Sequence, residues 1–149
     1  MKRFSFSLQT VHDQRAVQRE TAEREFVDAA RALSNAEAAL EKAIFEREIA
    51  VDAYIAHLES GAVDPQQLTL HVGHIARLVE RENEKRARLA SFERAQEIKR
   101  KAVITTTRDE KAITNLRDRH RARHEAAAAR IEQTALDEMA TMSFARRVR

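Results

Sequence analysis

The segment Ser60-Gly61-Ala62-Val63-Asp64-Pro65-Gln66-Gln67-Leu68 decides the fold, because it holds the only proline of the chain and one of its two glycines. Gly61 suits the left-handed conformation that ends a helix. Asp64 and Pro65 fit the N-cap and the first position of a second helix, and Gln67 predicts a capping box with Asp64. We therefore expect one helix to end just before this segment and another to begin inside it.

Outside this segment the composition is typical of long helices. The 149 residues are 34% charged and only 5% aromatic, with no tryptophan, which leaves little material for a large globular interior. Disordered chains are enriched in proline, glycine and serine, and this chain is not. We expect an all-α fold in which helices over about 7–59 and about 65–144, joined by a turn at 60–64, form one antiparallel coiled-coil hairpin spanning 1–149.

The two helices are expected to differ in length and regularity. At 1.5 Å per residue the first would be about 80 Å long and the second about 120 Å, so the second should end in a bare C-terminal extension. Gly73 and the β-branched run 103–107 have low helix propensity, and we expect a kink or local fraying at these two places.

The first helix carries apolar residues at alternating spacings of four and three, the stripe that two-stranded packing requires. One row reads Phe26, Leu33, Leu40, Arg47 and Tyr54, and the other reads Ala30, Glu37, Ile44, Val51 and Leu58. We expect the seam to consist of Phe26, Leu33, Leu40, Ile44, Val51, Tyr54 and Leu58. The repeat of the second helix is looser.

Charge favours pairing of the two arms with each other. Residues 1–60 hold 8 Lys/Arg against 11 Asp/Glu, and residues 61–149 hold 19 against 13, so the arms carry net charges of −3 and +6. Exposed pairs each contribute only tenths of a kcal/mol and are screened by salt. Pairing between two chains in a four-stranded bundle therefore remains an alternative.

Composition and motifs exclude several classes of function. The absence of cysteine excludes disulfides and thiol catalysis, and two isolated glycines cannot form a P-loop. Residues 1–13 do not contain the apolar run of a secretory signal. The chain also has no stretch of about twenty apolar residues, so we expect no direct membrane insertion. We expect a cytoplasmic protein that is not an enzyme and needs no cofactor.

Two histidine pairs have spacings that are found in metal sites. His120 and His124 lie four residues apart, where two imidazoles on one helix can reach one metal. Arg121 stands where the zincin motif needs a glutamate, and neighbouring arginines repel a cation. The same interpretation applies to His71 and His74, which lie three residues apart, so we predict no metal site.

A basic stretch over 85–123 is the feature that favours a nucleic-acid partner, because lysine and arginine contact phosphates. Acidic residues such as Glu93 and Asp109 interrupt it, and the chain has no recognition motif or stacking aromatic residue to contact bases. A solvated, charged helix face is the favoured interpretation, and nucleic acid is an unlikely partner. A nucleic-acid-binding coiled coil and a generic scaffold are the alternatives to the function considered next.

Motifs at both ends of the chain carry a resemblance. The N-terminal motif is Phe4-Ser5-Phe6-Ser7-Leu8-Gln9-Thr10-Val11, in which aromatic residues two apart are followed by Leu-Gln. The C-terminal motifs are the leucine-centred basic segment Lys111-Ala112-Ile113-Thr114-Asn115-Leu116-Arg117-Asp118-Arg119 and the segment Ile131-Glu132-Gln133-Thr134-Ala135-Leu136-Asp137-Glu138-Met139-Ala140 with its acidic pair. In their order and spacing these motifs resemble the FliJ family of flagellar export proteins and its type III secretion relatives, over nearly the whole chain.

The resemblance implies a coiled coil that acts as the central stalk of the export ATPase hexamer without hydrolysing ATP. It also implies contact with the cytoplasmic domain of the membrane export gate, escort of export chaperones, and a location at the inner-membrane export apparatus. The implied ATPase-ring contacts are Phe6, Leu8, Val11, Leu136, Met139, Met142 and Phe144. The implied gate contacts, just after the turn, are His74, Leu78, Arg81 and Lys85, of which the last two depart from the family toward cationic residues.

Overall fold

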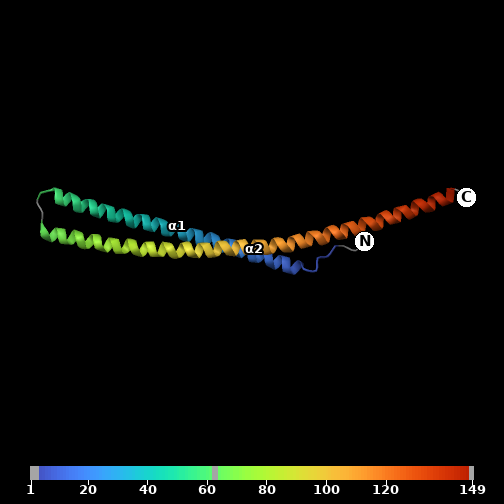
Figure 1. Ribbon diagram of the computed structural model, residues 1–149, viewed down its shortest axis with the longest axis horizontal. Coiled ribbons are helices and arrows are strands. Elements are labelled where there is room, and N and C mark those ends of the chain that lie inside the picture. Colours follow the sequence, from blue (N-terminus) through green and yellow to red (C-terminus); the bar gives the residue numbers. More distant parts are fainter. Residues whose placement is uncertain (1–3, 62–63, 148–149) are drawn as a thin grey trace. The chain divides into compact units, whose positions relative to one another are not determined.

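The computed structural model describes residues 4–61 and 64–147, with side chains up to residue 144. Two helices, α1 (Gln9–Glu59) and α2 (Pro65–Arg147), account for nearly all of these residues, and no strand occurs among them. The helices form an antiparallel coiled-coil hairpin with the second helix longer, as predicted (Figure 1). The expected weak places, Gly73 and 103–107, are helical without interruption, so packing and neighbouring helix formers outweigh their low propensity.

The turn follows from the residues that predicted it. Gly61 has a φ of 74°, the left-handed conformation that ends α1. The Asp64 carboxylate accepts a hydrogen bond from the backbone N–H of Gln66 at 2.9 Å and so caps α2. The predicted return bond from Gln67 to the Asp64 amide does not occur among the hydrogen bonds of the described residues. Residues 62 and 63 lie outside the described part of the chain.

The first helix begins two residues later than predicted. The backbone N–H of Gln9 donates to the Phe6 carbonyl at 3.1 Å, which forms a turn over Ser7 and Leu8 before α1 starts. Phe6 itself is buried, although it precedes the helix. The segment before α1 is therefore held by its aromatic side chain rather than by a cap at Ser7.

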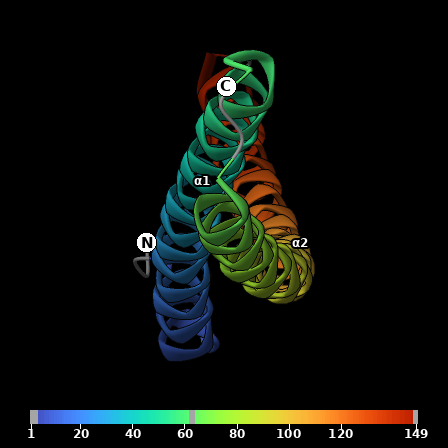
Figure 2. The ribbon, with the colours of Figure 1, turned by 90° about the vertical axis from the view of Figure 1, so that its left-hand side faces the viewer.

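The contacts of the chain divide it into two units, each described here by itself. The central unit comprises residues 21–61 and 64–104, and the terminal unit comprises residues 4–20 and 105–147. In the central unit α1 and α2 lie side by side (Figures 1 and 2). The seam between them is the only interior that two helices can form, so its residues carry the packing of this unit.

The α1 side of the central seam alternates large residues with alanines. The predicted row Phe26, Leu33, Leu40, Arg47 and Tyr54 is half-buried throughout. The second row is Ala22, Ala29, Ala36, Ala43 and Ala50, of which Ala22, Ala43 and Ala50 are the buried hydrophobic residues of α1. This alanine row lies one position before the predicted second row, because close approach of two helices places the small side chain beneath the partner. Ile44 and Val51 lie half-buried at the edge of the seam, Glu37 is exposed, and Leu58 is 41% exposed.

The α2 side of the central seam has a regular repeat that includes polar residues. One row is Leu68, Ile75, Glu82, Leu89, Gln96 and Val103, and the other is His71, Leu78, Lys85, Phe92 and Lys99. All of them are buried or half-buried except Phe92, which is more exposed. The heptad is therefore as strict as that of α1. The heptad repeat of α2 is irregular only when its polar seam residues are left out of the count.

A buried ion pair interrupts the apolar seam. The Glu82 carboxylate, buried between the helices, accepts hydrogen bonds from Arg47 Nε at 2.7 Å and from Arg86 Nη2 at 2.6 Å. The hydrogen bonds from Arg47 and then from Arg86 hold the pKa of Glu82 below its ordinary value. Removal of either end of such a pair leaves a charge without its partner, so this pair disfavours other alignments of the two helices.

Each unit by itself pairs the helices with the same offset in sequence. Arg47 bonds Glu82 in the central unit, and Arg19 bonds Glu110 in the terminal unit. Arg19 lies 28 residues before Arg47, and Glu110 lies 28 residues after Glu82. Both separations equal four heptads. The strict seven-residue repeat explains why one alignment serves both units.

Candidate functional site

The N-terminal segment packs on α2 in the terminal unit through two aromatic contacts. The ring centroids of Phe6 and His120 lie 5.9 Å apart, and the rings are nearly perpendicular. Phe4 and His124 make a similar edge contact at 5.6 Å. Aromatic rings prefer such edge-to-face arrangements because the ring edge is positive and the face negative. The two histidines that the sequence placed at a metal-like spacing therefore serve as packing partners for the two phenylalanines.

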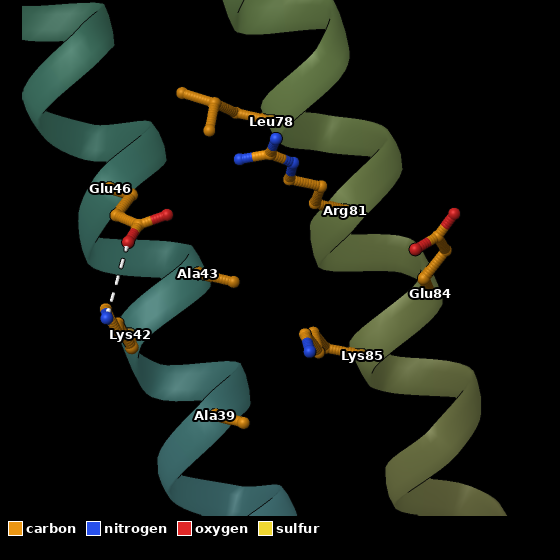
Figure 3. Close-up of a pocket in the computed structure, with 8 residues that line it drawn as sticks. All are labelled: Ala39, Lys42, Ala43, Glu46, Leu78, Arg81, Glu84 and Lys85. Atoms are coloured by element: carbon orange, nitrogen blue, oxygen red, sulfur yellow. Dashed lines mark ion pairs between the residues drawn. The ribbon is translucent and has the colours of Figure 1, made fainter.

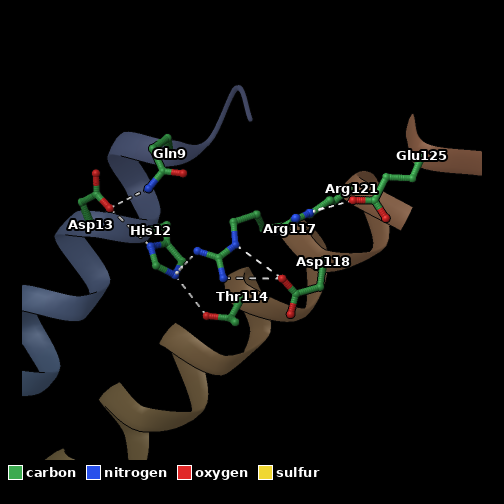
Figure 4. Close-up of polar contacts among 8 residues, drawn as sticks. All are labelled: Gln9, His12, Asp13, Thr114, Arg117, Asp118, Arg121 and Glu125. Carbon is green, nitrogen blue, oxygen red and sulfur yellow. Dashed lines mark hydrogen bonds and ion pairs between the residues drawn. The ribbon is translucent and has the colours of Figure 1, made fainter. Parts of the chain in front are cut away.

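A polar network around His12 follows next along the seam of the terminal unit (Figure 4). Nδ1 of His12 lies 3.3 Å from the Asp13 carboxylate, while Nε2 lies 3.2 Å from Thr114 Oγ1 and 3.5 Å from Arg117 Nη1. The carboxylate can only accept, so we assign the proton to Nδ1, which leaves Nε2 to accept from Thr114 and Arg117. His12 thus joins the start of α1 to α2.

Two ion pairs complete the attachment of α1 in the terminal unit. Arg15 Nη1 donates to Asp109 at 3.1 Å, and Arg19 Nε donates to Glu110. These pairs are partly exposed, so each contributes modestly, and they act chiefly to select the alignment of the helices. The sequence motifs did not predict them, because acidic residues were seen only as interruptions of a basic stretch.

Beyond residue 128 the second helix continues without a partner among the described residues. Every described side chain from 129 to 144 is exposed, in contrast to the seam positions that precede it. The larger apolar residues exposed here are Ile131, Leu136, Met139, Met142 and Phe144. A lone helix with exposed apolar side chains is stabilised by a partner that covers them.

The structure does not bring together the two halves of the predicted ATPase-ring contact. Phe6 is buried against His120, and Leu8 and Val11 lie partly exposed near it. The other predicted contacts, Leu136, Met139, Met142 and Phe144, lie on the unpartnered part of α2. The ring contact of both groups therefore stays a prediction, with the two groups at different places along α2. The aromatic contacts instead occur at His120 and His124.

The exposed apolar residues at the end of α2 are not all on one side of the helix. Ile131, Ala135, Met139 and Met142 follow spacings of four, four and three residues, which place them along one face. Leu136 and Phe144 fall on other sides of the helix. We call the first four residues the terminal face. It includes Ile131, which the predicted contact set omitted.

A cleft on one edge of the central seam collects three of the four predicted gate contacts (Figure 3). Leu78, Arg81 and Lys85 line a cavity of about 390 Å³, together with Glu84 of α2 and four residues of α1. The α1 residues are Ala39, Lys42, Ala43 and Glu46. The cavity exists because alanines face it from α1 and leave its apolar floor uncovered. We call it the central cleft.

The central cleft has an apolar floor and a charged rim. Leu78 is only 5% exposed and, like Ala43, belongs to the floor, so its side chain is more a structural element than a free contact. Lys42 and Glu46 form a long ion pair of 4.0 Å along the α1 side of the rim. Arg81 and Lys85 have no hydrogen bond or ion pair among the described residues. They are cations available to an acidic partner.

The fourth predicted gate contact lies outside this cleft. His74 is exposed and lines a neighbouring hollow with His71 and Arg77. His71 also contacts the rings of His57 and Tyr54 across the seam. Within the described residues no group of three or more histidine, cysteine, aspartate or glutamate side chains is placed to hold a metal ion. Nor does any described helix contain a segment long and apolar enough to cross a bilayer.

Comparison with known proteins identifies one family. The family described as "Flagellar FliJ protein" matches residues 4–149, nearly the whole chain. The match includes both helices, the turn and the unpartnered end of α2. No curated protein and no solved structure matches the chain.

Proposed function

The chain belongs to the FliJ family, which makes it a non-enzymatic component of the flagellar export apparatus, and we propose that it is the stalk that couples the export ATPase ring to the export gate. In this proposal the terminal unit binds the ATPase hexamer and the central cleft binds the cytoplasmic domain of the gate. The protein would work in the cytoplasm, peripheral to the inner membrane.

The unpartnered end of α2 is the observation that carries the ring contact. The terminal face leaves four apolar residues in a row uncovered, while the seam residues before it are covered by α1. A single helix is narrow, about 10–12 Å with its side chains, and so suits a ring pore. Covering the terminal face inside the ring would stabilise the hexamer that holds it.

Turnover of the cognate ATPase with and without this protein tests the ring contact. Ile131 and Ile98 are both 66% exposed on α2, the first on the terminal face and the second in the central unit. We expect Ile131→Asp to lose most of the stimulation and the matched control Ile98→Asp to keep it. Leu8→Asp tests the N-terminal half of the predicted contact in the same assay. Equal stimulation by Ile131→Asp and Ile98→Asp would refute the assignment.

The charge of the central cleft supports the gate contact. Arg81 and Lys85 offer two cations without partners beside an apolar floor, which fits a segment that combines acidic and apolar side chains. His74 would extend this contact along the same side of α2. Binding there requires no movement of Leu78, whose burial holds the floor in place.

Capture of the gate's cytoplasmic domain by the immobilised protein tests this assignment. We expect Arg81→Glu to weaken capture, because it replaces a cation of the cleft with an anion. Arg94→Glu is the control, since Arg94 is an exposed arginine of α2 that does not line the cleft. If both variants capture the domain equally well, the gate contact lies elsewhere.

Escort of export chaperones is the third part of the proposal and rests on family membership alone. No surface is assigned to it. A pull-down with each export chaperone tests it directly. Nucleic-acid binding is the alternative function. A salt titration of binding to duplex DNA tests it, since the affinity of phosphate-driven binding falls steeply with salt.

A further inference from the structure

Two large apolar side chains of α1 lie on the side of the helix that faces away from the seam. Phe45 is 61% exposed, and Ile49, one turn further on, is 53% exposed. The seam positions of this stretch are Ala43 and Arg47, so Phe45 and Ile49 occupy outward positions of the seven-residue repeat, which are usually polar. Packing within the hairpin therefore does not account for these two side chains.

The pair belongs to a longer stripe of exposed apolar residues. Ala38 lies seven residues before Phe45, Ala56 lies seven residues after Ile49, and all four are exposed. Spacings of seven and four keep them along one side of the helix, over about 27 Å at 1.5 Å per residue. The alanines let another helix approach closely at both ends of the stripe, while the two large side chains fill its grooves. We call these four residues the outer face.

Carboxylates border the outer face. Glu41, Glu48 and Asp52 are all exposed beside it. Glu41 and Asp52 have no hydrogen bond or ion pair among the described residues, and Glu48 has only a long ion pair, of 3.9 Å, with the adjacent arginine. Lys42, on the other side of the stripe, is paired with Glu46. The surroundings of the outer face are therefore negative, with charge that a partner can neutralise.

We propose that the outer face is the docking surface for an export chaperone, which binds through an amphipathic helix whose apolar stripe is flanked by lysine or arginine. A straight apolar stripe on a helix is the kind of surface that a second helix covers. The carboxylates select cationic flanks and disfavour nucleic acid and anionic lipid. This inference rests on the chaperone escort of the proposed function and adds to it a surface and the chemistry of the partner.

The outer face stays accessible while the other proposed contacts are occupied. The central cleft reaches α1 at Lys42 and Glu46 and shares no residue with the outer face (Figure 3). The cleft offers the cations Arg81 and Lys85, so the two surfaces of the central unit select partners of opposite charge. The terminal face lies in the other unit, on α2. Escort requires such separate surfaces, because the chaperone must remain bound while the stalk contacts the ring or the gate.

Binding of each purified export chaperone to the immobilised full chain tests the proposal. Ile49 and Val27 form a matched pair, because both are β-branched residues of α1 in the central unit and are 53% exposed, and only Ile49 belongs to the outer face. We expect Ile49→Ser to raise the dissociation constant of a chaperone about tenfold, since it removes an apolar contact. Val27→Ser should bind as the wild type does. Serine has a helix propensity close to those of isoleucine and valine, so neither change should alter the helix.

The charge of the outer face is tested separately in the same assay. Glu41→Lys should weaken binding about fivefold, because it places a cation opposite the cationic flank of the partner. Glu93→Lys is the control, since Glu93 is an exposed glutamate of α2 in the central unit that lies outside both the outer face and the central cleft. Binding to the wild type should also weaken as salt is added, because salt screens the exposed carboxylates.

The outcomes distinguish the outer face from chaperone escort itself. A wild type that binds no export chaperone refutes the escort and the outer face together. If the wild type binds a chaperone and Ile49→Ser and Glu41→Lys bind it equally well, escort stands and the outer face is refuted. Equal losses in Ile49→Ser and Val27→Ser refute the outer face as well. Circular dichroism accompanies each variant, and Phe45→Ser replaces Ile49→Ser if the helicity of the latter falls.

Discussion

Truncation of Leu78 to alanine should destabilise the hairpin more than the same change at any exposed leucine. Leu78 extends from α2 toward α1 and is 5% exposed, the lowest value among the buried hydrophobic side chains that the structure describes (Figure 3). Leu70 lies on the same helix and is 70% exposed, which makes Leu70→Ala the matched control. Both changes replace one good helix former with another, so helix propensity favours neither variant.

The magnitude follows from burial and from the shape of the site. A buried leucine replaced by alanine costs about 2–5 kcal/mol, depending on how far the surroundings collapse. The cavity of about 390 Å³ beside Leu78 is open to solvent, so the neighbouring side chains can relax and water can enter. We therefore expect the low end, about 2–3 kcal/mol. Leu70→Ala should change stability by less than about 0.5 kcal/mol.

Urea unfolding followed by circular dichroism at 222 nm measures both variants. We expect Leu78→Ala to shift the unfolding midpoint downward with little change in slope, because the surface exposed on unfolding stays similar. Leu70→Ala should unfold at the wild-type midpoint. If the two variants cost the same, the side chain of Leu78 does not pack between the helices, and the assignment of the seam fails.

Three further predictions test other features of the fold. Ala50→Leu should cost about 1–3 kcal/mol by overpacking the alanine row, whereas Ala56→Leu, at an exposed position, should be nearly neutral in the same unfolding assay. The lowered pKa of Glu82 means that the charged carboxylate stabilises the fold above its ordinary pKa and that this contribution is lost as the pH falls. Glu82→Gln should therefore be less stable than wild type at pH 7, with the difference closing under acid. Arg15→Glu should lose about 0.5 kcal/mol, and Asp109→Arg in the same chain should restore part of it, which a double-mutant cycle measures.

Local signals explain why the overall fold was predictable from sequence. Gly61, Asp64 and Pro65 act on the backbone within a few residues, so their effect on the turn does not depend on the rest of the chain. The seam row from Phe26 to Tyr54 was also predictable, because apolar residues that recur every seven positions indicate the buried face of a helix. Family motifs at the two ends correctly indicated the FliJ family.

The second seam row needed the tertiary structure. A search for large apolar residues selects Ile44 and Val51, but the covered positions are Ala43 and Ala50. Which of two adjacent positions faces the partner depends on how closely the helices approach, and a helix pattern alone does not contain that distance. Counting apolar residues also concealed the repeat of α2, where polar members such as Glu82 are matched by charges on α1.

The candidate contact surfaces likewise combine features that the sequence predicted with features that depend on the tertiary structure. Capping, helix propensity and periodicity are local properties, so the sequence was sufficient to predict a two-helix hairpin. Only the tertiary structure decided that Phe6 meets His120 and that α2 beyond residue 128 has no partner among the described residues. That outcome depends on the alignment of α1 with α2, which is selected by pairs such as Arg19 and Glu110 that lie far apart in sequence. Such ion pairs stabilise the fold only when both helices have formed and lie side by side.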